Sequence, residues 1–141
     1  DFVHTHTGEE LSLPWLVGAA EPHALEQAHP FLRDFRNGEE HPIDPALLDL
    51  LSALQGRLGP TEPFHVISGY RSPATNEMLR RTRGGQARNS LHLRGKAVDI
   101  RVPGVPLARL RDAGLALRRG GVGYYPRSDF VHLDTGRVRR W

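Results

Sequence analysis

Two residues on either side of a glycine have the right types for a metal site. His92 and Asp99 flank Gly95, where the chain can turn sharply and bring the imidazole beside the carboxylate. One imidazole and one carboxylate are part of a catalytic zinc site, which uses three protein ligands and leaves one position open. On local chemistry alone, however, a surface histidine and an aspartate in an ordinary ion pair explain the two residues better.

A second chemical signal lies in residues 129–134. His132 is flanked by apolar residues there, and a lone histidine in an apolar strand is more often a satisfied half-buried residue than a ligand. Asp129 could act as general base toward a water if it lies in the turn before the strand. Strict alternation puts Asp129 on the opposite face from His132. Asp134 shares the face of His132, so it is the rival base or a partner that orients the imidazole.

Arg71 is a third candidate, because it follows Ser68-Gly69 at an expected turn between a strand and a helix. A guanidinium there is placed to bind a substrate carboxylate or to polarise a carbonyl. The alternative is a structural salt bridge, with Glu77 as the candidate partner. His4 and His6 offer a rival metal pair, since residues two apart on a strand share a face.

The elements that must position these residues follow from hydrophobic spacing and from turn residues. Helices are predicted at residues 24–36 (kinked or split at Pro30), 45–58 with Asp44 as N-cap, 73–83 before Gly84-Gly85, and 106–118. Strands are predicted at residues 64–67, 96–102, 121–125 and 130–134. In the second of these predicted strands, residues 96–102, Asp99 lies on the face opposite Val98 and Ile100, away from the core packing.

The remaining N-terminal segment, residues 1–13, reads as an extended arm or a short hairpin, and we place the end of this arm at about residue 20. Helices then come first and strands cluster in the second half. This order favours an α+β fold, with helices packed on a mainly antiparallel sheet. The length of 141 residues suits a single domain over residues 1–141.

Composition narrows the function classes. The chain has no cysteine, so any metal must be held by histidines and carboxylates. The net charge of +3 comes with scattered arginines and a single lysine, Lys96, which indicates a solvated surface and no nucleic-acid partner. No apolar run approaches the roughly twenty residues of a membrane helix. The start at Asp1 without Met fits a processed export signal or a trimmed chain.

Taken together and in this order, the segments resemble the zinc D-alanyl-D-alanine peptidase superfamily, which has the hedgehog/DD-peptidase fold. The motifs are an arginine after a Ser-Gly-Tyr turn, Ser-x-His-x-x-Gly-x-Ala-x-Asp, and an acid three residues before a final histidine. They stand here as Ser68-Gly69-Tyr70-Arg71, Ser90 to Asp99, and Asp129 to His132. Further matches resemble the YcbK-like branch, which includes periplasmic murein endopeptidases: His6 to Glu9, Leu32 to Asp34, Leu47 to Leu51, Gly120 to Pro126 and Arg139 to Trp141.

The resemblance implies a zinc metallopeptidase that cuts peptide crosslinks or stem peptides of peptidoglycan. It implies His92, Asp99 and His132 as Zn²⁺ ligands, and it assigns roles to three further residues: Asp129 as general base, Arg71 on the scissile carbonyl or a carboxylate, and Ser90 in contact with substrate. It also implies an exported, periplasmic monomer. Two alternatives stay open, a zinc-containing cell-wall binding module that does not hydrolyse and a D-Ala-D-Ala carboxypeptidase. The bond that is cut also stays open.

Overall fold

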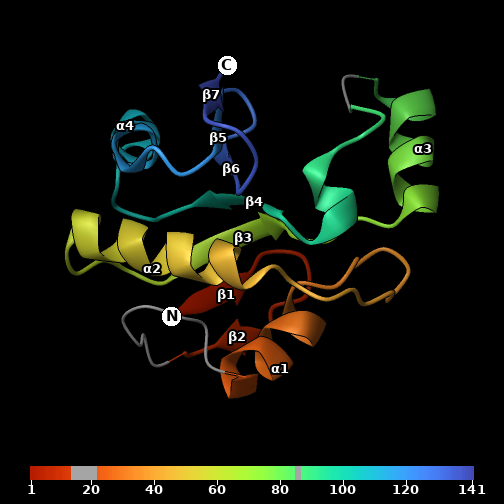
Figure 1. Ribbon diagram of the computed structural model, residues 1–141, viewed down its shortest axis with the longest axis horizontal. Coiled ribbons are helices and arrows are strands. Elements are labelled where there is room, and N and C mark those ends of the chain that lie inside the picture. Colours follow the sequence, from red (N-terminus) through yellow and green to blue (C-terminus); the bar gives the residue numbers. More distant parts are fainter. Residues whose placement is uncertain (14–21, 85–86) are drawn as a thin grey trace.

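The computed structural model describes residues 1–13, 22–84 and 87–141, and in them the strands form one seven-stranded sheet (Figure 1). The sheet order is β2-β1-β3-β4-β6-β5-β7. The strands are β1 (Phe2–His4), β2 (Glu10–Leu11), β3 (Phe64–Ser68), β4 (Ala97–Arg101), β5 (Gly121–Tyr125), β6 (Phe130–Asp134) and β7 (Arg139–Arg140). The helices are α1 (Pro22–Phe31), α2 (Pro45–Leu58), α3 (Pro73–Thr82), α4 (Leu107–Leu117) and the 3₁₀ helix η1 (Leu91–Arg94).

The sheet is mainly antiparallel, as predicted. Only the β1–β3 and β5–β7 pairs among the described strands are parallel. Helix α4 packs on β5 and β6 and against α2, while α3 stands at the far end of the molecule from α4 (Figure 1). The α+β class and the single layer of sheet covered by helices are therefore confirmed.

Helix α2 carries the centre of the core. The Asp44 carboxylate accepts a hydrogen bond from the Ala46 amide at 3.0 Å and so caps the first turn. The apolar stripe predicted from spacing is buried along its whole length: Leu47, Leu48, Leu50, Leu51, Leu54 and Leu58. This face fixes α2 against the sheet that carries the site.

Helix α1 is shorter than predicted, because it ends at Phe31 and not near residue 36. Pro30 lies in its last turn, where it has no amide hydrogen to donate to the Glu26 carbonyl oxygen. Beyond it, the Asp34 carboxylate accepts hydrogen bonds from the amides of Arg36 at 3.0 Å and Ser72 at 2.9 Å. These bonds turn the chain away from the helix axis and tie it to the segment that carries Arg71.

The N-terminal segment belongs to the sheet as a short hairpin, which is one of the two forms expected. β1 pairs with β2 in antiparallel fashion and with β3 in parallel fashion, so strands are not confined to the second half of the chain. The rest of the expected arm, residues 14–20, lies outside the described residues, as does the Gly85 part of the helix stop after α3. No helix among the described residues is long and apolar enough to span a bilayer.

Candidate metal centre

Strands β4 and β6 bring Asp99 and His132 together. They are direct partners in the antiparallel register of these two strands. Directly opposed residues point to the same face of a sheet and lie within contact distance. Both side chains are nearly inaccessible, with residue exposures of 6% for Asp99 and 9% for His132. The pair is therefore fixed by the register of the two central strands.

His92 reaches the same point from outside the sheet. It lies on η1, and the chain then reverses at Gly95 with φ of 67°, a left-handed conformation that favours glycine. A Cβ at position 95 would lie 2.2 Å from the Pro42 carbonyl oxygen, so only glycine fits this approach. The turn expected at Gly95 thus presents the His92 imidazole to β4.

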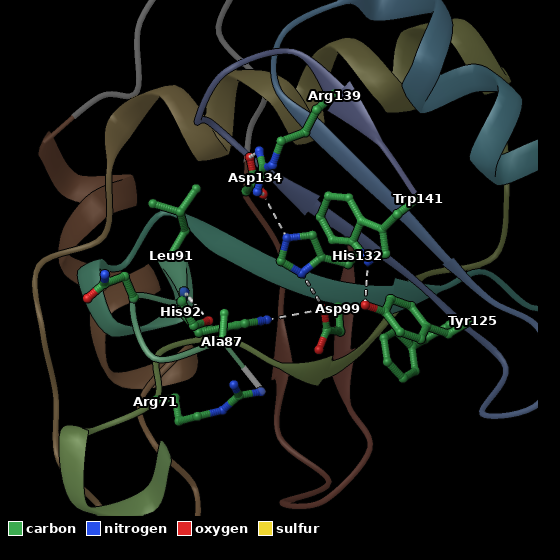
Figure 2. Close-up of a pocket in the computed structure, with 13 residues that line it drawn as sticks. Arg71, Ala87, Leu91, His92, Asp99, Tyr125, His132, Asp134, Arg139 and Trp141 are labelled. Carbon is green, nitrogen blue, oxygen red and sulfur yellow. Dashed lines mark hydrogen bonds and ion pairs between the residues drawn. The ribbon is translucent and has the colours of Figure 1, made fainter. Parts of the chain in front are cut away.

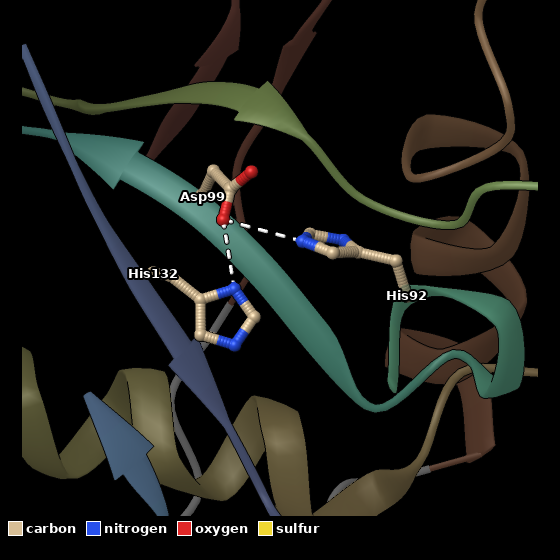
Figure 3. A group of neighbouring side chains, drawn as sticks. All are labelled: His92, Asp99 and His132. Atoms are coloured by element: carbon tan, nitrogen blue, oxygen red, sulfur yellow. Dashed lines mark hydrogen bonds and ion pairs between the residues drawn. The ribbon is translucent and has the colours of Figure 1, made fainter. Parts of the chain in front are cut away.

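The three side chains converge on one carboxylate oxygen (Figure 3). Asp99 Oδ1 lies 3.3 Å from His92 Nε2 and 3.0 Å from His132 Nδ1. Candidate ligand atoms of the three residues all lie within 4.8 Å of one another. Ligands at about 2.1 Å from a tetrahedral ion are about 3.4 Å apart, so this spacing fits a zinc-sized ion.

The outer nitrogen of each imidazole is held by an acceptor. His92 Nδ1 donates to the Gly69 carbonyl oxygen at 2.7 Å, which leaves Nε2 as the nitrogen that faces Asp99. His132 Nε2 donates to Asp134 Oδ2 at 2.8 Å, so its Nδ1 is the nitrogen directed to the centre. Outer hydrogen bonds of this kind fix the tautomer and ring orientation of metal-binding histidines. Two nitrogens and one oxygen are thus aimed at a common point.

Asp134 is itself fully buried and saturated with donors. Arg139 donates to both of its carboxylate oxygens, at 3.0 and 2.9 Å, and the amides of Gly121 and Gly136 donate to Oδ1. Burial alone would raise the pKa of Asp134, but the hydrogen bonds from His132 and Arg139 outweigh it and hold this pKa well below its usual range. Asp134 therefore acts as a fixed anion behind His132.

The same balance applies at the centre. Burial would raise the pKa of Asp99, yet the charge of His92 and the hydrogen bonds from both histidines hold it well below its ordinary value. For His132, burial works to lower the pKa, and the hydrogen bonds to Asp134 and Asp99 overcome it and raise the pKa to about 9. The ionised carboxylates of Asp99 and Asp134 thus place negative charge on both sides of His132, in a site that favours a bound proton or cation.

Arg71 lines a cavity of about 300 Å³ beside the three residues (Figure 2). It is 9% exposed, its Nη1 donates to Asn76 Oδ1 at 3.2 Å, and its buried Nε has no partner in the described structure. Burial lowers the pKa of Arg71, while the charge of Asp99 opposes that effect. The salt bridge considered with Glu77 is not formed, since Glu77 pairs with Arg80 and Arg81. Arg71 is thus a buried cation with donor capacity left for a ligand.

Asp129 and Ser90 occupy less central places. Asp129 lies in the turn before β6 with φ of 59°, its side chain is 66% exposed, and it lies 3.7 Å from Arg101. It is not among the residues that line the cavity in the described part of the chain. Ser90 does line the cavity, and its hydroxyl accepts a hydrogen bond from the His92 amide at 3.3 Å, which caps η1.

His4 and His6 lie elsewhere, in an aromatic cluster. The His6 ring stacks on Phe35 with centroids 4.1 Å apart, and the His6 amide donates to His4 Nδ1 at 3.2 Å. Among the described residues, the histidine and carboxylate group with metal-binding geometry contains neither of them.

Sequence reasoning from spacing assigned no role to several residues around the cavity. Gly69, which supports His92, and Arg139, which donates to the Asp134 carboxylate behind His132, belong to motifs that were recognised only as resemblances. The aromatic side of the cavity was missed altogether, although Trp141 closes a stretch that matches the family. The cavity is lined by Arg71, Ala87, Asn89, Ser90, Leu91, His92, Asp99, Tyr125, Phe130, His132, Asp134, Arg139 and Trp141.

Comparison with known proteins gives a consistent picture. A family model described as "Peptidoglycan L,D-endopeptidase MepK" matches residues 1–141. The chain is similar to the protein of that name from Escherichia coli K12, with 45% identity over 96% of this chain and 75% of the relative. It is also similar to the probable peptidoglycan L,D-endopeptidase MepK of Haemophilus influenzae, with 44% identity over 99% of this chain and 76% of the relative.

Among solved structures, a match is the Serratia marcescens L-Ala D-Glu endopeptidase ChiX, with 27% sequence identity and a TM-score of 0.43. It covers 55% of this chain and 62% of that structure.

Proposed function

The chain belongs to the peptidoglycan L,D-endopeptidase MepK family, and from this membership we propose that it is a zinc-dependent endopeptidase of bacterial peptidoglycan. The observation that carries the zinc part is the convergence of His92 Nε2 and His132 Nδ1 on Asp99 Oδ1, with the outer nitrogen of each ring already bound. The family's own name specifies a bond between an L- and a D-centre. For this chain we therefore propose the direct crosslink between two diaminopimelate residues.

In this proposal His92, Asp99 and His132 hold Zn²⁺. The donor set of two imidazoles and one carboxylate is one that zinc enzymes use, and three protein ligands leave room for a further one. When bound, zinc acts as a Lewis acid and makes water a nucleophile near neutral pH. Asp134 keeps the His132 ring in place from behind and, because all its oxygens accept hydrogen bonds, takes no part in proton transfer.

The chain's other residues bind substrate and move the proton. Arg71 donates to the scissile carbonyl or to a nearby carboxylate, and its place in the lining of the cavity supports such a contact. Ser90 contacts substrate from the rim of the cavity. Asp129 takes the proton from the attacking water and passes it to the leaving amine. This last role requires the exposed carboxylate to leave Arg101 and turn toward the cavity when substrate is bound.

The exposed position of Asp129 is the observation that favours a second candidate, a zinc-containing module that binds cell-wall peptides without cutting them. A fold alone does not settle between these functions. In either case we propose peptidoglycan peptides as the partner, an exported protein acting at the cell wall, and a monomer.

Purified muropeptides test the proposal directly. Zinc-loaded protein is incubated with three substrates, a direct diaminopimelate crosslink, a D-alanyl crosslink and a pentapeptide with terminal D-alanine, and the products are identified by mass spectrometry. We expect cleavage of the first, and loss of that cleavage in the His92→Ala control. Binding of all three without any product would favour the binding module, and release of D-alanine alone would make the chain a carboxypeptidase.

A further inference from the structure

The cavity has two unlike walls (Figure 2). Arg71 lies on one side of the His92, Asp99 and His132 group. Aromatic rings lie on the other side, where the Tyr125 and Phe130 rings stack with centroids 4.6 Å apart and the Trp141 indole lies beside His132 with centroids 5.1 Å apart. A basic wall and an apolar wall on either side of the reacting position can select substrate by its chemistry.

The position of Trp141 is built by its backbone. Its amide donates to the Val122 carbonyl oxygen at 3.1 Å, and its carbonyl oxygen accepts from the Tyr124 amide at 3.0 Å, so it continues the pairing of β7 with β5. Gly123, between these two partners, leaves the space for the indole. A Cβ at position 123 would lie 2.6 Å from the indole Cε2 and 2.8 Å from Nε1.

The indole is held at its polar edge and still exposed. Trp141 Nε1 donates to the Tyr125 hydroxyl at 2.5 Å, and the Arg139 guanidinium lies 4.9 Å from the ring centroid. Even so, Trp141 is 49% exposed, although it is the largest apolar side chain lining the cavity. A large aromatic ring that is fixed in place and left open to solvent has apolar surface available for a ligand.

We infer that Trp141, seated on Gly123 and held by Tyr125, determines substrate specificity by packing against the aliphatic side chain of the peptide residue beside the scissile bond. The inference rests on the proposed function. The indole lies next to His132, and the cavity of about 300 Å³ is small, so what reaches the ring is a residue adjacent to the reacting carbonyl and not the glycan strand. A chain of methylenes matches the flat apolar face, while Arg71 opposite takes the polar end of the substrate.

The test compares sugar-free crosslinked peptide dimers with the same dimers carrying their disaccharides. Steady-state kcat and KM, zinc content and calorimetric affinity are measured for zinc-loaded wild type, Trp141→Ala, Trp141→Phe and Gly123→Ala. Gly123→Ala keeps the indole but displaces it, and so separates the position of the ring from its presence. Arg140→Ala is the matched control, because Arg140 precedes Trp141 directly as the last residue of β7, is exposed and does not line the cavity.

We expect Trp141→Ala to raise KM on the order of tenfold on both substrates, as loss of one large apolar contact predicts. In Trp141→Ala we expect kcat to change less than KM and zinc content to stay at the wild-type level. Gly123→Ala should raise KM as well, and Trp141→Phe should retain part of the affinity. Arg140→Ala should match wild type. An unchanged KM, a defect seen only on disaccharide-bearing dimers, or loss of zinc would each overturn the inference, the last by making the indole a support of His132.

Failure of the proposed function is seen separately, as wild-type protein that yields no product. In that case the calorimetric affinities decide. Weaker binding of the sugar-free dimer by Trp141→Ala than by wild type supports the inference, and equal binding overturns it.

Discussion

Each imidazole beside Asp99 uses one ring nitrogen as an anchor and leaves the other for the centre. The anchors differ in kind, since His92 is held by the neutral Gly69 carbonyl and His132 by the Asp134 carboxylate. A carboxylate behind a histidine makes the imidazole more basic, and so a stronger metal ligand, as well as orienting it. This electronic effect of an anchoring carboxylate therefore applies to His132 and not to His92.

This arrangement predicts that Asp134→Asn weakens zinc binding by about 10–100-fold, the usual cost of losing such a partner. The substitution keeps the side-chain shape and removes the charge that holds His132 and pairs with Arg139. Zinc affinity is measured by competition with a chelator, with Asp112→Asn, an exposed aspartate of α4, as control. Wild-type zinc affinity together with abolished turnover would identify Asp134 as the base.

Asp129 has the opposite profile. We expect Asp129→Ala to bind zinc as wild type does and to fold normally, because the residue is exposed and its contact is a surface pair with Arg101. Turnover of the crosslinked dimer should fall by about 10²–10⁴-fold if Asp129 accepts the proton. Arg101→Ala serves as the control that removes the surface pair and keeps the carboxylate. Full activity of Asp129→Ala would remove it from the mechanism.

At the scale of elements, most of the strands and turns that position the proposed ligands could be predicted from the sequence. Alternation along 96–102 put Asp99 on the face away from Val98 and Ile100, and a turn at Gly95 was enough to expect His92 nearby. Alternation does not give register, so the pairing of Asp99 with His132 across two strands could not be derived from spacing. It entered only through the family resemblance.

Contacts made by backbone atoms were out of reach of sequence reasoning. Gly69 supports His92 through its carbonyl oxygen, for which no residue type is diagnostic. Short pairings such as β7 carry no periodicity, so the location of Trp141 was also missed. The hairpin of β1 and β2 was predicted only as one of two forms, because polar residues interrupt its alternation.

Strand β1 places His4 in a fully buried position, with consequences for stability. Burial, followed by the charge of His6, lowers the pKa of His4 from 6.5 to about 4, while Glu9 opposes the shift. The unfolded chain then binds more protons than the folded one between these values, so stability rises with pH over that window. The part due to His4 is about 3 kcal/mol, lost as pH falls from 6.5 to 4.

Urea unfolding of the zinc-free protein at pH 4.5 and pH 7 measures this effect. We expect His4→Phe, which keeps an aromatic ring among Phe31 and Phe35, to lose less stability on acidification than wild type does. His23→Gln, a change at an exposed position of α1, should behave as wild type. The same pH dependence in wild type and His4→Phe would refute the assignment.

For the whole molecule, the proposed ligands join a segment outside the sheet to two paired strands of the sheet. His92 comes from η1, outside the sheet, while Asp99 and His132 come from its two central strands. The unfolded chain does not keep these residues together, so zinc binds the folded state preferentially and must stabilise it. The segment around η1, which carries His92, should gain the most stability.

We therefore predict that zinc raises the free energy of unfolding by about 2.7 kcal/mol when its free concentration is 100 times the dissociation constant. The increment should disappear in His92→Ala at the same zinc concentration, because one of three ligands is lost. His6→Gln is the matched control and should keep the full increment, since His6 stacks on Phe35 away from the site. Urea unfolding with and without a chelator measures the difference.

The increment should also shrink toward low pH, where protons compete for the imidazole nitrogens. Loss of the increment in His6→Gln would place zinc in the N-terminal hairpin, and an equal increment in His92→Ala would separate His92 from the metal.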